Sequence, residues 1–216
     1  MIYINIHTHF KPESDDIWVI RNAYLKSVGK SAIPYAVSNG LHPWFIEKYP
    51  HFHAQELEQI LRNNAAVAVG ECGLDRIKGP DKLLQEKVFM QHLYVAEKMK
   101  LPLIIHCVRM YDALYDLVRN TQSRLILHGY SASLVQTQRM LNVPHLYFSI
   151  GIREWKRMGL EQKKALPIER LFLENDGIRM DFKALYADCA AFYGYSLEKF
   201  AEQLFRNASI IDWKRK

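Results

Sequence analysis

Two histidines separated by one residue, His7 and His9, follow a strand-like apolar run near the start of the sequence. In an extended chain the side chains at positions i and i+2 point to the same side. Both imidazoles could therefore reach one metal ion from the end of a buried strand. Two ligands are too few for a tight site, and short His-x-His pairs also arise by chance. The pair is a candidate that the rest of the chain must support.

Further residues of the same chemical types come directly after other apolar runs. They are His42, Glu71, His106 with Arg109, His128, and Glu174 with Asp176. Imidazole and carboxylate together suit Zn²⁺, Mn²⁺, Fe²⁺ or Mg²⁺. Even four histidines and two carboxylates from this set would be too many for one catalytic ion that must keep an open position. They suit two ions that share a bridging carboxylate, clamp a phosphoryl group and activate water.

The elements that must position these residues alternate between strand and helix. Eight short apolar runs are expected as strands, at 2–6, 17–20, 33–37, 65–69, 101–105, 124–127, 146–150 and 171–173. Amphipathic patterns predict helices at 55–63, 81–100, 110–120, 133–141, 160–166, 183–192 and 197–205. Such alternation is typical of a parallel sheet, and eight strands favour a closed α/β barrel of the (β/α)8 TIM type. The carboxyl ends of its strands would bring the histidines and carboxylates to one mouth.

The first two β/α units are expected to be shortened and irregular. About ten residues separate the first two runs, and about twelve separate the second from the third. Parallel neighbours need a crossover of about a dozen residues or more. Loops are therefore predicted in place of the first helices.

Composition sets the broad class of protein. The 216 residues, 49% of them hydrophobic, predict one barrel domain over 1–216. No apolar run is long enough for a membrane helix, and no signal peptide precedes the first strand. Three widely spaced cysteines favour a reduced, cytoplasmic protein. The net charge of +6 points weakly to anionic partners, and no obligate protein partner is predicted.

The order of these motifs resembles the TatD-related metal-dependent hydrolases, a family of amidohydrolase-like TIM barrels. The residues that carry the resemblance run from His7 to Asp176: His-x-His, Gly-x-His-Pro at 40–43, Gly-Glu-x-Gly-Leu-Asp at 70–75, His-x-x-Arg at 106–109, His-Gly-Tyr at 128–130 and Glu-x-Asp at 174–176. The resemblance implies a Mg²⁺-, Mn²⁺- or Zn²⁺-dependent hydrolase of phosphoester bonds, with a deoxyribonuclease as the first expectation and DNA among its phosphorylated substrates.

The resemblance also implies roles for individual residues. His7 and His9 would hold one of two divalent ions together with Asp176, and His106 and His128 would hold the other. Glu71 would bridge the ions. Two residues, His42 and Arg109, would face the substrate phosphate, where arginine offers a bidentate fork. Asp176 would also be the base for the attacking water.

Two departures from the family pattern adjoin the expected ligands. Asn5 stands where the family opens with Asp, and Asn175 stands where most relatives have Thr. Two other readings remain open: an amidohydrolase-like enzyme acting on a small molecule, and a degenerate barrel that binds a partner without catalysis. Against the first, Glu71 occupies the place where many amidohydrolases carry a carboxylated lysine.

Some residues have simpler interpretations. Trp44 and Trp155 could stack on a base, but for Trp155 packing of a loop is the preferred reading. His92, within the longest predicted helix, is expected to be structural. Glu174 is expected to orient neighbouring ligands rather than to bind an ion.

Overall fold

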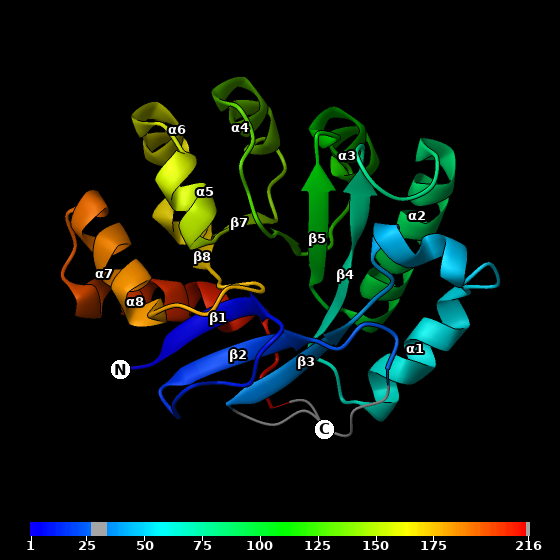
Figure 1. The fold of residues 1–216 in the computed structure, drawn as a ribbon, viewed down its shortest axis with the longest axis horizontal. Coiled ribbons are helices and arrows are strands. Elements are labelled where there is room, and N and C mark those ends of the chain that lie inside the picture. Colours follow the sequence, from blue (N-terminus) through cyan, green and yellow to red (C-terminus); the bar gives the residue numbers. More distant parts are fainter. Residues whose placement is uncertain (27–33, 215–216) are drawn as a thin grey trace.

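Eight parallel strands close into a barrel in the order β1 to β8, as the sequence predicts (Figure 1). The computed structural model describes residues 1–26 and 34–214. The strands are β1 (Tyr3–Thr8), β2 (Ile17–Asn22), β3 (Tyr35–Asn39), β4 (Ala68–Asp75), β5 (Leu103–Val108), β6 (Leu125–Leu127), β7 (Leu146–Ile150) and β8 (Leu171–Leu173). The (β/α)8 prediction is therefore confirmed; Ile33, in the predicted third strand, lies outside the described residues.

Helices follow the later strands and pack around the barrel (Figure 1). They are α1 (Ala54–Asn63), α2 (Lys82–Met99), α3 (Tyr111–Val118), α4 (Leu134–Met140), α5 (Ile152–Arg157), α6 (Leu160–Ala165), α7 (Phe182–Tyr193) and α8 (Leu197–Asn207), with short 3₁₀ helices η1 (Pro43–Lys48), η2 (Ile168–Arg170) and η3 (Ala208–Ile210). The sequence missed α5, whose six residues span too few turns for an apolar period to emerge.

The first two crossovers lack helices where they are described. Residues 9–16, between β1 and β2, contain none, and neither do the described residues between β2 and β3. The expected irregularity of the first units is confirmed. In Figure 1, β1, β2 and β3 lie at the lower front of the barrel, and α8 reaches β2 through the contact of Phe205 with Trp18.

Apolar side chains fill the barrel interior. Residues of seven strands form one cluster, and side chains from that many strands can meet only inside the barrel: Ile4, Ile6, Ile20, Ala36, Ala68, Ile104, Ile126 and Phe172. A second, larger cluster joins the outer faces of the strands to the helices. The polar residues of the strand ends are thus mounted on a rigid, close-packed base.

The barrel closes between β1 and β8 over a short seam. Asn5 is in register with Leu173, and an isolated bridge joins Thr8 to Asp176. The hydroxyl of Tyr186, on α7, accepts a hydrogen bond from the Ile4 N–H and donates one to the Ile4 carbonyl. The side chain of a covering helix therefore completes the backbone bonding of β1 where β8 is too short to do so.

None of the helices in the described part of the chain combines the length and apolar character needed to cross a bilayer.

Candidate metal centre

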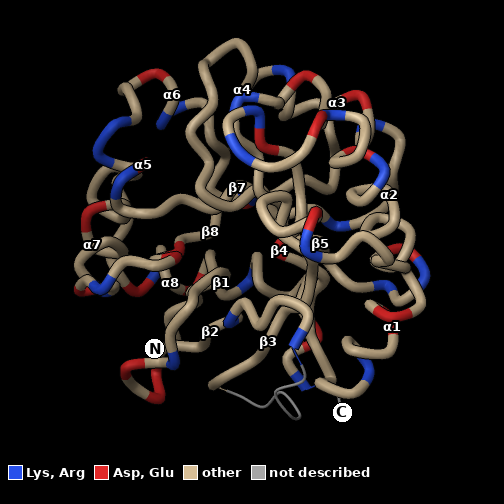
Figure 2. Tube along the Cα trace, turned by 45° about the vertical axis from the view of Figure 1, so that its right-hand side comes forward, with Lys and Arg blue, Asp and Glu red and all other residues tan. Residues whose placement is uncertain are grey.

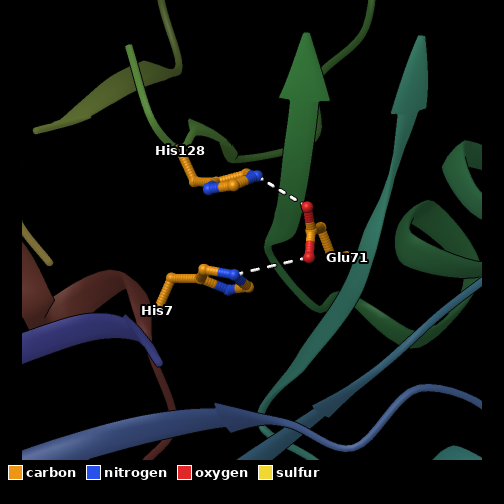
Figure 3. A group of neighbouring side chains, drawn as sticks. All are labelled: His7, Glu71 and His128. Carbon is orange, nitrogen blue, oxygen red and sulfur yellow. Dashed lines mark ion pairs between the residues drawn. The ribbon is translucent and has the colours of Figure 1, made fainter. Parts of the chain in front are cut away.

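Three groups of histidines and carboxylates meet at the carboxyl ends of the strands. Within each group, each residue has one ligand atom that lies within 4.8 Å of those of the other two. In the part of the chain that the structure describes, the groups are His7–Glu71–His128, His7–His9–Asp176 and His42–Glu71–His106. Figure 3 shows the first group, with the Glu71 carboxylate between the two imidazoles. The structure thus brings together all six residues expected as metal ligands, and His42 with them.

Asp176 draws the two N-terminal histidines together. Its Oδ1 lies 3.1 Å from His9 Nε2 and 3.6 Å from His7 Nε2. The backbone fixes this pairing, because the Asp176 N–H donates to the His7 carbonyl and the His9 N–H donates to the Asp176 carbonyl. The seam between β1 and β8 therefore sets the geometry of this group.

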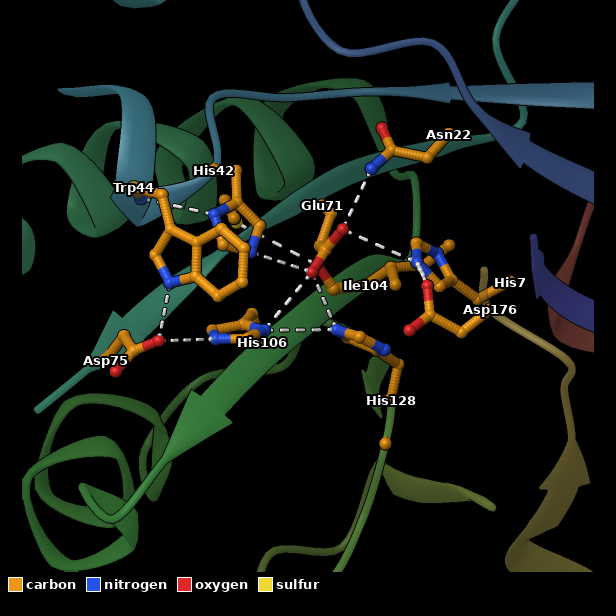
Figure 4. A network of polar contacts seen from close by, with 12 residues as sticks. His7, Asn22, His42, Trp44, Glu71, Asp75, Ile104, His106, His128 and Asp176 are labelled. Atoms are coloured by element: carbon orange, nitrogen blue, oxygen red, sulfur yellow. Dashed lines mark hydrogen bonds and ion pairs between the residues drawn. The ribbon is translucent and has the colours of Figure 1, made fainter. Parts of the chain in front are cut away.

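Glu71 lies at the centre of the site, where histidines from four other segments surround its carboxylate (Figure 4). Its Oε1 is 2.7 Å from His128 Nε2, 3.2 Å from His106 Nδ1 and 3.0 Å from His42 Nε2, whereas Oε2 is 3.4 Å from His7 Nε2. Asn22 Nδ2 donates to Oε2 at 2.8 Å. With one oxygen towards each side, Glu71 has the position of a bridging carboxylate.

Two glycines flank Glu71 because β4 and β5 approach closely there. A Cβ on Gly70 would lie 2.3 Å from the Ile104 carbonyl oxygen, and one on Gly73 would lie 1.9 Å from that of His106. Both residues also have a positive φ, which side chains disfavour. This explains the Gly-Glu-x-Gly spacing, and β4 runs on to Asp75 beyond its predicted end at 69.

Two carboxylates contact the ring nitrogens of His106 and His128 that do not face Glu71. Asp75 Oδ2 is 3.1 Å from His106 Nε2, and Glu174 Oε1 is 3.3 Å from His128 Nδ1. A neutral ring that keeps its proton for the outer carboxylate presents the lone pair of its other nitrogen to Glu71. The expected orienting role of Glu174 thus matches its contacts, and Asp75 is a second residue in the same position.

In His42 the proton lies on the ring nitrogen that faces Glu71, unlike in the rings of His106 and His128 described above. Its Nδ1 accepts the Trp44 N–H at 3.1 Å, so in the neutral ring the proton is on Nε2, which faces Glu71. Burial lowers the pKa of His42 and keeps the ring neutral. A protonated nitrogen donates hydrogen bonds and binds no cation, so His42 differs from the other histidines of the site.

The electrostatics of the group favour added positive charge. Burial lowers the pKa of His7, but the contacts with Asp176 and Glu71 outweigh it and raise the pKa to about 9. Burial raises the pKa of Glu71, but the surrounding histidines hold it well below its usual range. The carboxylates thus draw protons onto the imidazoles, which is the charge that a cation would supply in their place.

The buried His7 side chain provides a test of the fit to a cation. Among the described residues neither of its ring nitrogens makes a hydrogen bond of good geometry, although the residue is fully buried. An orphaned buried nitrogen is costly unless a ligand satisfies it. Its Nε2 faces two carboxylates, and nitrogen and oxygen donors of this kind suit divalent transition metals or Mg²⁺. The residues fit the implied ions.

Arg109 stands apart from this group. It follows β5 with a positive φ and an exposed side chain, and within 1–26 and 34–214 no acid pairs with it. It borders a cavity that Asp75 also lines. The structure therefore places Arg109 at the rim of the site rather than among the ligands.

Sequence reasoning missed three polar residues of the network. Asp75 accepts hydrogen bonds from the Trp44 indole at 2.6 Å and from the N–H groups of Ile77 and Lys78 (Figure 4). Asn22 donates to Glu71, and Tyr24 Oη lies 3.5 Å from His9 Nδ1. The position of Asp75 at the end of a conspicuous motif was an available signal, whereas Asn22 and Tyr24 carry none.

The two departures from the family pattern contact each other. Asn5 Nδ2 donates to Asn175 Oδ1 at 3.0 Å, and the Asn175 N–H lies 3.4 Å from Asn5 Oδ1. An amide pair therefore joins β1 to the segment after β8, directly behind His7 and Asp176. Because the two substitutions satisfy each other, neither leaves a buried group unpaired.

Two aromatic residues outside the site have structural roles. Nε2 of the buried His92 accepts the Leu41 N–H, and Nδ1 bonds the Val88 carbonyl, while Phe52 stacks on the ring. Trp155 is buried and packs edge-on against Phe192. Both match the packing interpretation.

Comparison with known proteins gives consistent results. The sequence model of a family described as TatD-related DNase matches residues 20–209. A protein of Edwardsiella piscicida named 3'-5' ssDNA/RNA exonuclease TatD is 34% identical over 147 residues, which cover 63% of this chain and 55% of that protein. An Escherichia coli protein named uncharacterized metal-dependent hydrolase YjjV is 33% identical over 66% of this chain and 58% of its own length. The chain thus spans little more than half the length of these curated relatives.

Solved structures have the same fold. The crystal structure of the E. coli TatD homologue YjjV superposes with a TM-score of 0.78 at 24% identity and covers 96% of both chains. That of a TatD-family hydrolase from Entamoeba histolytica gives a TM-score of 0.76 at 14% identity over 99% of both chains.

Proposed function

This chain belongs to the TatD-related DNase family, and we propose that it is a divalent-metal-dependent hydrolase of phosphoester bonds in nucleic acid. The observation that carries the proposal is the buried Glu71 carboxylate, which has histidines on both of its oxygens. The names of two relatives, an exonuclease and a metal-dependent hydrolase, support this class of activity. The proposal includes a single domain over 1–216, a cytoplasmic location and no obligate protein partner.

The proposed ligands are drawn from these groups, with His42 left out because its Nε2 carries a proton. His7, His9 and Asp176 would hold one ion and His106 with His128 the other, with Glu71 shared by both. When bound, Mg²⁺, Mn²⁺ or Zn²⁺ would neutralise charge on the phosphoryl group and lower the pKa of a water molecule.

Three side chains of the protein would act on the substrate. His42 has its Nε2 proton available to donate to a phosphoryl oxygen. Arg109, exposed at the rim, would hold a second phosphoryl oxygen through its guanidinium. Asp176 would accept the proton of the attacking water, since its carboxylate reaches the site yet remains half exposed. Burial raises the pKa of Asp176, but His7 and His9 lower it by more than burial raises it. The Asp176 carboxyl is therefore ionised at neutral pH.

A substrate panel tests this proposal. Single-stranded DNA, duplex DNA, RNA and simple phosphate esters are incubated with Mg²⁺, Mn²⁺, Zn²⁺ or EDTA, and the products are counted. We expect cleavage of at least one nucleic acid with a divalent ion and none with EDTA. Amide and lactone substrates are added to the panel, and cleavage of these alone would instead identify a small-molecule hydrolase. Binding of nucleic acid without turnover under any ion would identify a non-catalytic barrel.

Removal of divalent ions should also lower thermal stability. A ligand present at 100 times its Kd stabilises the folded state by about 2.7 kcal/mol. In a domain of this size each kcal/mol changes Tm by roughly 2–4 °C, so chelation should lower Tm by roughly 5–10 °C. Differential scanning calorimetry with Mn²⁺ and with excess EDTA measures the difference. An identical Tm in both buffers would contradict a folded-state metal site.

Asp75→Asn should weaken metal binding without unfolding the barrel. The substitution removes the charge that faces His106 Nε2, and loss of such an outer partner typically costs about 10- to 100-fold in metal affinity. Competition with a chelating dye gives the affinity for Mn²⁺, and NMR of the imidazole nitrogens reports the tautomer of His106. Asp112→Asn, which changes an exposed carboxylate nearby, is the control. Unchanged affinity in Asp75→Asn would remove its role.

A further inference from the structure

A cavity of about 500 Å³ lies beside the metal centre, between the segment that joins β4 to α2 and the start of α3. Its volume is within the range of ligand pockets in proteins. Asp75 connects the two places: the residue lines the cavity, and its buried carboxylate bonds His106 in the centre. One imidazole ring therefore separates the cavity wall from Glu71.

The charges around the cavity are unequally satisfied. Basic and acidic segments lie close together around α2, α3 and β5 (Figure 2), and the lining includes three cations and three carboxylates. Each carboxylate already has a donor within the protein: Asp75 has the Trp44 indole, Asp81 the Leu84 N–H, and Asp112 the guanidinium of Arg139.

The arginines of the cavity have no such partners. Arg76 and Arg109 are exposed, and no acid pairs with either among the described residues. Lys82, the third cation, has only a 3.4 Å pair with Glu86 one turn along α2. Asp112 is paired with Arg139 and Asp75 is buried against His106, whereas the guanidiniums of Arg76 and Arg109 have no acid partner in the described part of the chain. Two exposed positive charges are therefore available to an anionic ligand.

The loop that carries Arg76 is held in place before any ligand binds. The buried Gln85 side chain accepts the Asp75 N–H and donates to the carbonyls of Asp75 and Pro80. The Asp75 carboxylate also accepts two N–H groups of the same loop. A fixed backbone reduces the entropy lost when Arg76 binds a ligand.

We propose that this cavity binds a phosphate of the nucleic-acid strand next to the phosphate under attack, with Arg76 as its principal contact. The inference rests on the proposed function. The proposal places Arg109 between the two phosphates. It also gives the nucleic-acid strand a path across the barrel mouth, from the metal centre towards α2 and α3. A substrate with one phosphate would leave the cavity unused.

Arg76→Gln tests the proposal through two substrates. For a short single-stranded DNA, we expect KM to rise about tenfold with little change in kcat, since a charged contact to the substrate is lost. For bis(p-nitrophenyl) phosphate, which has one phosphate, both constants should stay as in the wild type. The slope of the logarithm of DNA affinity against the logarithm of salt concentration should decrease by about 1, which corresponds to the loss of one phosphate contact.

Arg119→Gln is the matched control. Arg119 is exposed at the far end of α3 and loses the same charge, so it should change neither substrate's kinetics. Equal effects of Arg76→Gln on both substrates, or equal effects of the two variants on DNA, would overturn the proposal.

Direct binding separates this proposal from the hydrolytic one. Fluorescence anisotropy of labelled single-stranded DNA with the full chain in EDTA needs no turnover. Weaker binding by Arg76→Gln than by Arg119→Gln supports the cavity even if the wild type cleaves no substrate in the panel. Equal binding by the two variants refutes it even if the wild type is an active nuclease.

Discussion

Glu71→Gln should reduce turnover by at least about 10³-fold, which corresponds to roughly 4 kcal/mol of transition-state stabilisation. The amide keeps the shape of the side chain and can still accept the Asn22 hydrogen bond, so the fold should survive. What it loses is the charge that four histidines surround. Single-turnover kinetics with Mn²⁺, together with elemental analysis of the purified protein, measure both effects. We expect less than one ion per chain, because both ions would share this carboxylate.

The control for this variant is Glu161→Gln, which neutralises an exposed carboxylate that pairs with Lys164. Its activity and metal content should equal those of the wild type. Circular dichroism establishes that both variants are folded. A folded Glu71→Gln protein with full activity would remove the bridging role and the two-metal mechanism with it.

Asp176→Asn should reduce kcat by about 10²- to 10⁴-fold, the usual contribution of a general base. Its effect on metal content should differ from that of Glu71→Gln. Among the described residues the Asp176 carboxylate pairs with His7 and His9, so the amide disturbs one ligand set and leaves His106, His128 and Glu71 intact. We expect close to one ion per chain and a nearly unchanged affinity for DNA. Elemental analysis and anisotropy measure these quantities.

Asp188→Asn serves as the matched substitution, since Asp188 is an exposed residue of α7 away from the strand ends. It should behave as the wild type in every measurement. If Asp176→Asn retained two ions and full kcat, neither the proposed ligand set nor the proposed base could be correct.

The sequence was sufficient for the architecture because the strands contain apolar runs that are largely buried on both faces. β1 and β4 are buried along their whole length, and such runs differ visibly from the amphipathic helices between them. It also brought out the candidate ligands, since strand ends that carry histidines and carboxylates converge in any closed parallel barrel.

What the sequence could not supply depends on distances between side chains. The tautomer of His42 follows from a hydrogen bond to the Trp44 backbone, and the position of Asp75 behind His106 follows from the register of β4 with β5. Neither contact leaves a periodic or compositional trace. For the same reason the replacement of Asp by Asn at position 5 reads in the sequence as a lost charge, whereas the structure shows a partner for it in Asn175.

The seam between β1 and β8 has a consequence for how the protein is assembled. It joins segments at opposite ends of the barrel sequence: the bridge between Thr8 and Asp176 spans 168 residues. Contacts of such separation carry a large loop-closure entropy and form only once the intervening chain is ordered. The group of His7, His9 and Asp176 cannot form in a chain that is only partly synthesised or partly folded, because its members come from both ends of the barrel sequence. A metal site formed by this group would therefore be a product of completed folding and could not serve as its nucleus.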